Sequence, residues 1–240
     1  MSKKLKVFLG ISYLFILLIF LYFIFSNIEI SRLNDFLYYK ELQINLENFI
    51  GSNIYANLAL FFIFSIIWVT LLGFGSPILI ISGILFGKWI GTFISVISIS
   101  FGALILYTIA NFFFADLGQN IFKNKFSKYT NLFKKNEFYY FFVYRFVGGL
   151  GVPFCLQNIL PVIFNMKKLN YFFSSMLGFI PGFFVFNTIG AGLNKYVKQS
   201  DNFSFIDLIL NQEVYLPLTM FVFLILISFF IKKKIFDDKY

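Results

Sequence analysis

Arg145 is the residue whose type and surroundings most clearly suggest chemistry. The chain has 20 basic residues, but only Arg32 and Arg145 are arginines, so lysine serves wherever a plain positive charge is enough. Arg145 follows the apolar run Phe141-Phe142-Val143-Tyr144. An ionised side chain at such depth is costly and marks a candidate functional site, and a guanidinium fits phosphate or carboxylate. The alternative is that Arg145 extends to the membrane interface or caps carbonyls freed by a break at Pro153.

Three other polar residues near Arg145 are candidates for contact with a substrate. Tyr144 directly precedes it, and Gln157 and Asn158 follow in the same broken apolar region. The two amides could equally satisfy backbone groups left unpaired by the break. Asn111 and Asn187, in two long apolar runs, have the same two possible roles.

The sequence offers Arg145 no fixed carboxylate partner. Neither Asp nor Glu occurs in residues 50–115 or 138–200, so an acid could reach it only if Asp116 folds back from the interface. We therefore expect a mobile anion, such as a lipid phosphate, or backbone carbonyls to be its partners. A proton relay built on buried carboxylates is disfavoured for the same reason.

Composition excludes several other kinds of site. The chain has no histidine, and Cys155 is its only cysteine, so a His- or Cys-based metal site, a disulfide framework and a Cys–His nucleophile are excluded. We expect no metal, no cofactor and no enzymatic activity. Cys155 is interpreted as a small apolar residue.

The elements that must position these residues belong to a membrane protein. Hydrophobic residues make up 59% of the 240 positions and charged residues 13%, and the mean hydropathy is +0.82. This leaves too little polar surface for a soluble protein. The net charge of +9 comes from lysine clusters between long apolar runs, which indicates topology rather than nucleic-acid binding.

We predict an all-α polytopic fold with about four full transmembrane helices, over residues 7–25, 90–114, 170–190 and 215–231. The first run is interpreted as an uncleaved signal-anchor helix rather than a cleaved signal peptide. The expected organisation is a signal anchor in 1–28, an extracytoplasmic segment in 29–53, a membrane core in 54–195, and a final segment in 196–240 with the last span and a basic tail.

Glycine and proline interrupt the core. Such breaks leave backbone groups unpaired, which lipid does not tolerate unless the segments pack together or line a wet cavity. We therefore predict two re-entrant hairpins, in residues 54–87 and 138–165. The expected breaks are Gly73, Gly75, Pro77, Gly83, Gly87, Gly149, Gly151, Pro153, Pro161 and Pro181.

The two broken regions resemble each other. The run Gly73-Phe74-Gly75-Ser76-Pro77 is matched 76 residues later by Gly149-Leu150-Gly151-Val152-Pro153. At the same offset Ser98 matches Ser174, Gly102 matches Gly178, and Asn111 matches Asn187. Paired breaks of this kind in two halves indicate a transport site between inverted repeats.

Lysine distribution predicts the orientation of the chain. The N-terminus, residues 116–137, Lys167-Lys168 and the C-terminal tail are lysine-rich and should be cytoplasmic, while 29–50 and 193–214 should be outside. In this topology Lys88 is the one charge on the side of the membrane that the rule does not favour. Residues 116–137 also have one aromatic and one basic face, typical of a helix on an anionic membrane surface or of a solvated connecting helix.

These motifs together resemble a known family. Gly83-Ile84-Leu85-Phe86-Gly87 ends the first hairpin, an aromatic residue precedes Arg145 by four positions, and Pro153-Phe154, Asn158 and the run from Leu169 to Gly182 follow. Over residues 54 to 195 the chain is similar to the VTT domain of the DedA/SNARE-associated Golgi protein superfamily. Two features depart from it: Gly148 stands where many members have proline, and the acidic residues of the proton-linked members' first hairpin are absent.

The resemblance implies opposed re-entrant hairpins and the scrambling or flipping of phospholipids or polyprenyl-phosphate carriers, with anionic lipids as partners. The missing acids disfavour proton coupling. A bacterial inner membrane is the expected location. The alternatives are a small-solute or ion transporter that uses the same cavity, and a membrane scaffold without transport.

Overall fold

The computed structural model describes residues 3–26, 36–122, 133–199, 204–212, 214–220, 222–223 and 226–227, and the structural statements below concern these residues. They contain helices and no strand, which confirms the all-α class. The α-helices are α1 Lys3–Ser26, α2 Phe36–Ser52, α3 Ile54–Leu72, α4 Ser76–Phe122, α6 Glu137–Phe146, α7 Phe154–Ile159, α8 Lys168–Gln199 and α9 Phe205–Leu210. Two short 3₁₀-helices, η2 Gly148–Gly151 and η3 Leu160–Val162, lie on either side of α7.

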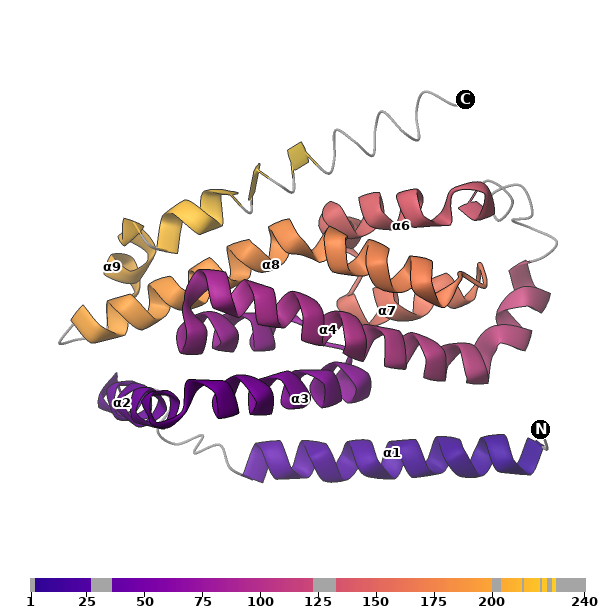
Figure 1. Cartoon of the computed structure of the whole chain (residues 1–240), viewed down its shortest axis with the longest axis horizontal. Coiled ribbons are helices and arrows are strands. Elements are labelled where there is room, and N and C mark those ends of the chain that lie inside the picture. The colour runs from indigo at the N-terminus through magenta and orange to yellow at the C-terminus, as the bar shows by residue number, and fades with distance from the viewer. Residues whose placement is uncertain are drawn as a thin grey trace.

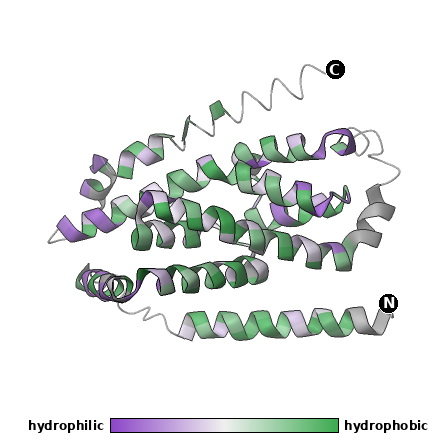
Figure 2. Ribbon diagram, viewed as in Figure 1, coloured by the Kyte–Doolittle hydropathy of each residue, from purple (hydrophilic) through white to green (hydrophobic). Residues whose placement is uncertain are grey.

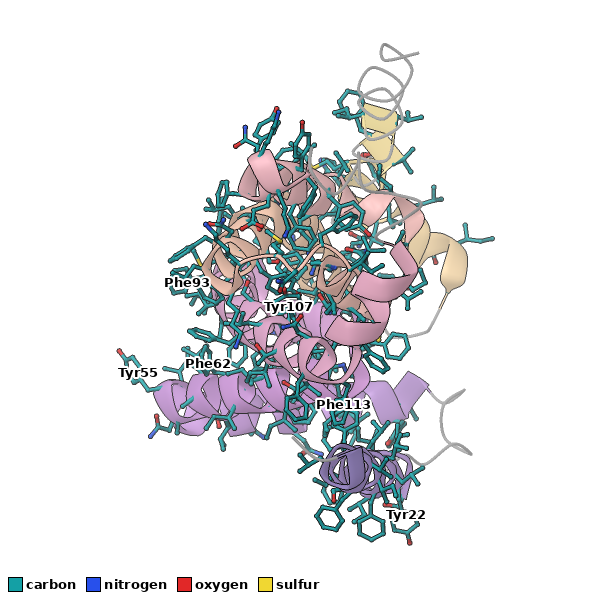
Figure 3. All side chains as sticks on the ribbon, turned by 90° about the vertical axis from the view of Figure 1, so that its right-hand side faces the viewer. Tyr22, Tyr55, Phe62, Phe93, Tyr107 and Phe113 are labelled. Atoms are coloured by element: carbon teal, nitrogen blue, oxygen red, sulfur yellow. The ribbon has the colours of Figure 1, made fainter. Side chains whose placement is uncertain are left out.

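Four of these helices contain stretches long and apolar enough to cross a membrane: Val7–Ile24, Ile54–Leu71, Ser76–Phe114 and Lys168–Gln199. Hydrophilic residues gather at the two ends of the helix bundle (Figure 2), and apolar rings cover much of its outer surface, with Tyr22 and Tyr55 pointing outward and Tyr107 inside (Figure 3). This arrangement suits a bilayer around the middle of the bundle.

The match to the predicted spans is partial. The predicted spans 7–25 and 170–190 fall within α1 and α8, and 90–114 falls within α4. The sequence predicts residues 54–72 as one arm of a hairpin, whereas α3 is also long enough to span a membrane. In the predicted span 215–231, residues 215–220, 222–223 and 226–227 are described and helical, and the others lie outside the described residues. In the amphipathic stretch 116–137, residues 123–132 lie outside them.

The first broken region folds back on itself twice. Helix α3 ends at Gly73, whose φ of 67° places it in the left-handed region while its N–H still bonds the Val69 carbonyl. Helix α4 is interrupted at Gly87, with φ 73° and ψ 177°. Ser82 Oγ donates to the carbonyl of Gly91 at 3.0 Å, although nine residues of straight helix span about 13 Å. The chain therefore reverses at Gly87, and residues 76–86 return alongside α3 as predicted for a hairpin.

The second broken region forms a similar hairpin from the other end of the bundle. Helix α6 leads into η2, where Gly148, Gly149 and Gly151 all have positive φ, and α7 starts after Pro153. Figure 1 shows α3 at one end of the molecule and α6 at the other. Their turns meet, since a Cβ placed on Gly73 would lie 2.8 Å from Cβ of Cys155. The predicted pair of opposed hairpins is thus consistent with the fold.

The remaining predicted breaks have different roles. Gly75 packs against the Phe154 ring, and Pro77 lies in the first turn of α4. Pro161 lies within η3, and Pro181 lies inside α8, which continues past it. Pro181 therefore does not end the helix as a hairpin turn would.

The internal repeat is visible in the packing. A Cβ on Gly102 would meet the Ile66 carbonyl and Cβ of Val69 at 2.9 Å each. A Cβ on Gly178 would meet the Phe142 carbonyl at 3.0 Å and Cβ of Arg145 at 2.5 Å. Each of these three positions in the second half lies 76 residues after its counterpart in the first. The two halves therefore repeat one helix–helix contact, and the buried counterpart of Arg145 is Val69, which is apolar.

Helix α1 is tied to the first hairpin by one tyrosine. Tyr13 Oη donates to the carbonyls of Thr70 at 2.8 Å and Leu71 at 3.0 Å, which belong to the last turn of α3 and lack helical partners. Phe20 adds an edge contact with Trp68 at 6.1 Å between ring centroids. The end of α3 therefore lies beside the middle of α1.

We expect Tyr13→Phe to loosen α1 from the bundle. The variant loses a hydrogen bond that stabilises the protein by about 1 kcal/mol and leaves two carbonyls unpaired. A fall in Tm of a few degrees, measured by thermal unfolding in detergent, would agree with this. Tyr22→Phe is the matched control, because Tyr22 lies on the same helix and is 76% exposed. An equal fall in Tm for both substitutions would show that the Tyr13 hydrogen bonds do not hold α1 against α3.

Candidate functional site

Arg145 is buried where α6, α7 and α8 meet. It lies on the buried face of α6 together with Glu137 and Phe141, and only 3% of its surface is exposed. Nη1 donates to Oε1 of Gln157 at 3.0 Å, and Nη2 donates to Oδ1 of Asn158 at 2.5 Å. Nη2 also donates to Oη of Tyr171 at 3.1 Å, which brings α8 into the site. The fold thus brings Arg145 together with both candidate amides.

Aromatic rings enclose the guanidinium. Its Cζ lies 4.7 Å from the ring centroid of Phe179 and 4.8 Å from that of Phe141. Phe154 and Tyr171 are next, at 5.5 and 5.8 Å. Each ring face attracts a cation, and together the rings keep water away from the charge. Arg145 therefore does not extend to the surface of the protein, which removes the interface alternative.

The break at Pro153 positions the amides. Gln157 Nε2 donates to the carbonyls of Val152 at 2.7 Å and Gly148 at 3.3 Å, which the interrupted helix leaves free. Gly149 is required beside it, because a Cβ there would overlap the Gln157 amide. Gln157 thus satisfies broken backbone, one of the two roles that the sequence left open, and it also holds Arg145. Its contact with a substrate stays a prediction. The alternative that Arg145 itself caps these carbonyls is not what the structure shows, because Gln157 bonds them instead.

Two donors of the site have no acceptor among the described residues. Within the described residues, Nε of Arg145 and Nδ2 of Asn158 are buried without a hydrogen-bond partner. In the described part of the chain, the hydrogen bonds of Arg145 all go to neutral side-chain oxygens. Buried polar groups are normally paired, so unpaired donors around a cation are unusual. They could donate two more hydrogen bonds to the oxygen atoms of an anion.

Tyr144 lies beside the site rather than in it. Its ring stacks on Phe141 at 5.7 Å between centroids, and its buried hydroxyl has no hydrogen-bond partner among the described residues. The structure shows no hydrogen bond between it and Arg145. Tyr144 therefore belongs to the aromatic packing of α6, and its contact with a substrate stays a prediction.

Two residues that the sequence did not single out clamp the start of α8. Glu137 Oε1 accepts from the backbone N–H of Lys167 at 3.1 Å and from Nδ2 of Asn170 at 2.6 Å. On the other side, Tyr107 donates to the Met166 carbonyl at 2.6 Å. Its ring stacks on Tyr171, with 4.5 Å between centroids and 12° between planes. Together they fix the ring of Tyr171, whose hydroxyl holds Arg145.

The sequence contained some signal for these residues. Glu137, Phe141 and Arg145 recur every four positions, as one helix face does. Tyr171 and Phe179 lie in the run from Leu169 to Gly182 that resembles the VTT family. Nothing local marked Tyr107, which lies 38 positions before Arg145.

The other predicted polar residues are peripheral to this cluster. Asn187 Nδ2 donates to the Phe183 carbonyl of its own helix at 2.8 Å, and the Oδ1 atoms of Asn187 and Asn111 are buried without partners among the described residues. Cys155 is a half-buried free thiol that packs against Gly73. The Asp116 side chain lies outside the described part of the chain.

Comparison with known proteins agrees with this geometry. The family model of the VTT domain matches residues 69–192. That range holds both hairpin turns and every side chain that contacts the Arg145 guanidinium. No solved structure matches the chain. With its apolar helices and paired hairpins, the chain belongs to the VTT-domain family, the DedA/SNARE-associated Golgi family of integral membrane proteins.

Proposed function

We propose that the protein moves phosphate-bearing lipids, phospholipids or polyprenyl-phosphates, between membrane leaflets, with Arg145 binding the phosphate. The observation that supports this most is a buried guanidinium with an unpaired Nε–H next to an unpaired Asn158 amide. A buried ion costs several kcal/mol in desolvation unless charge and hydrogen bonds compensate for it. A phosphate oxygen offers both, since it is anionic and accepts several bonds.

Glu137 does not serve as the counter-ion in this proposal. Its Oε1 is already held by α8, and it lies two turns before Arg145 on α6. A mobile anion is then the natural partner of Arg145. Because the rings of Phe141 and Phe179 cover the guanidinium, the proposal requires that they move when a head group binds.

The hairpin turns support a crossing point at half depth in the bilayer. If α1 spans the membrane, Tyr13 lies near the middle of it, and Tyr13 holds the end of α3. The turns that meet at Gly73 and Cys155 then lie at mid-membrane, where a polar head group faces its largest barrier. We further propose a bacterial inner membrane location with both termini in the cytoplasm, on the basis of the lysine clusters.

Lipid movement can be tested in liposomes that carry a trace of fluorescent phospholipid. Dithionite quenches only the outer leaflet, so we expect protein-free vesicles to retain inner-leaflet fluorescence and vesicles with the protein to lose it. Parallel vesicles with an entrapped soluble dye check for leaks. No lipid movement together with solute uptake would favour a small-solute transporter instead, and neither activity would favour a scaffold.

A further inference from the structure

A polar pocket lies at the opposite end of α8 from the Arg145 contact. It has a volume of about 320 Å³ and lies between α2, the reversal at Gly87 and the end of α8. Gln43, Asn194 and Lys198 provide its polar side chains, and Leu46, Ile50 and Ile84 are among its apolar ones. Figure 1 shows α2 and the end of α8 together at one end of the bundle.

The polar side of this pocket is rich in donors. Gln43 Nε2 donates to Asn194 Oδ1 at 3.0 Å, which orients the Nδ2 donor of Asn194 away from that bond. Lys198 adds an ammonium in the last turn of α8. The helix that begins after Gly87 points its first N–H groups back toward the turn, and the first N–H groups of a helix have no helical acceptors. An anion fits this set better than a cation.

Gly87 leaves the backbone accessible at this point. Its φ of 73° is unfavourable for any residue with a side chain, and a Cβ there would have nothing within 4 Å. The turn therefore presents bare backbone to open space beside the pocket. A ligand can approach the peptide groups of the reversal closely.

The pocket also lies at a level suited to an amphiphile. Hydrophilic residues gather at the end of the bundle formed by α2 and the end of α8, and apolar residues begin directly beyond them (Figure 2). Leucine and isoleucine side chains of α2 and α4 form one wall. A ligand with an anionic head and an apolar body would satisfy both parts of the lining.

Helix α8 connects this pocket to the Arg145 site. Gly178, which packs on Arg145, and Asn194 are about 25 Å apart along the helix. Phe179 and Phe183 lie between them, with ring centroids 4.5 Å apart and planes 8° apart. Phe179, which also covers the guanidinium, and Phe183 therefore lie along α8 between the residues of the two sites.

We propose that the pocket of Gln43, Asn194, Lys198 and Gly87 is a docking site for the phosphate head group of an amphiphile, distinct from Arg145. The choice of a lipid as occupant rests on the proposed lipid-transport function, and the phosphate chemistry rests on the lining alone. A head group bound in this pocket would be separated from Arg145 along α8 by the stacked rings of Phe179 and Phe183.

Trp89 offers a direct measurement of binding. It lies two residues after Gly87 and is 70% exposed, and the chain has only one other tryptophan, Trp68. In the full-length Trp68→Phe protein, in nanodiscs of phosphatidylcholine, Trp89 fluorescence is titrated with dihexanoyl phosphatidic acid below its micelle concentration. Dihexanoyl phosphatidylcholine and inorganic phosphate are titrated in parallel.

We expect saturable binding of the phosphatidic acid, weakened about tenfold or more by Lys198→Gln and by Asn194→Leu, as the loss of one charge-assisted hydrogen bond predicts. Lys195→Gln is the matched control, because it removes an equal charge from an exposed position on α8 outside the pocket. We expect its affinity to remain within about twofold of the parent.

Three results would overturn the proposal. The first is a titration that does not saturate, and the second is an equal loss of affinity in Lys195→Gln and Lys198→Gln. The third is inorganic phosphate that binds as tightly as the lipid, which would indicate a phosphate site rather than a lipid site. Arg145→Gln should leave the titration unchanged. Binding without lipid transport would thus refute the proposed function but support the docking site. Lipid transport without binding would refute the docking site.

Discussion

Replacing Arg145 with alanine is expected to abolish lipid transport in liposomes while the protein still folds into the membrane. The substitution removes the only charge that contacts Gln157, Asn158 and Tyr171 in the described cluster. It leaves Oε1 of Gln157 without its donor, at about 1–3 kcal/mol, whereas Oδ1 of Asn158 still accepts from the Tyr171 hydroxyl at 3.2 Å. It also removes the desolvation cost of a buried ion. The two effects oppose each other, so the loss should appear in transport more than in stability.

Arg145→Lys should restore part of the rate. Lysine keeps the charge, but its ammonium cannot bond the oxygens of Gln157 and Asn158 with the same planar fork. Arg145→Gln keeps hydrogen bonding without charge and should be as inactive as alanine if charge is what binds the head group. Dithionite quenching kinetics at matched protein density measure all three variants.

Val69→Ala is a control that the repeat itself provides. Val69 packs on Gly102 as Arg145 packs on Gly178, and it is fully buried. Truncating it should lower stability through a small cavity, by about 1–3 kcal/mol, and leave lipid transport close to the parent rate. Unchanged transport in Arg145→Ala, or equal losses in Arg145→Ala and Val69→Ala, would show that the buried cation has no specific part in transport.

The second large effect is expected at Gly83. A Cβ on Gly83 would overlap the backbone carbonyl of Asn187, so α4 and α8 can pack here only because the side chain is absent. Gly83→Ala must push the two helices apart, at a cost of about 3 kcal/mol, the upper end for an overpacked core. We expect Tm to fall by roughly 10 °C in thermal unfolding in detergent.

Gly182→Ala is the matched substitution. Gly182 also lies inside α8, but a Cβ there would have nothing within 4 Å. Alanine favours a helix by about 1 kcal/mol over glycine, so this variant should be as stable as the parent or slightly more stable. Equal Tm values for Gly83→Ala and Gly182→Ala would mean that the close contact of α4 with α8 does not contribute to stability.

Much of the architecture could be predicted because it depends on local properties of the chain. Apolar length determines which segments can cross a bilayer, and glycine or proline at Gly73, Gly87 and Pro153 restricts the backbone wherever it occurs. The spacing of 76 residues between the two similar halves is also visible in the sequence, and the equivalent packing of Gly102 and Gly178 agrees with it. The rarity of arginine singled out Arg145 without any knowledge of the fold.

The partners of Arg145 depended on packing between distant segments. Tyr171 lies 26 residues after it and Phe179 lies 34 after it, and only the close approach of α6 and α8 at Gly178 brings them to the guanidinium. Glu137 ends the hydrophilic stretch 116–137 in the sequence, yet the fold buries it against the start of α8. Composition and backbone preference act within a few residues, so they define spans, breaks and the charge that needs a partner. Long-range packing decides which side chains supply that partner. Here only the tertiary structure shows that neutral oxygens and aromatic rings hold the cation, and that two nearby N–H donors are left unpaired.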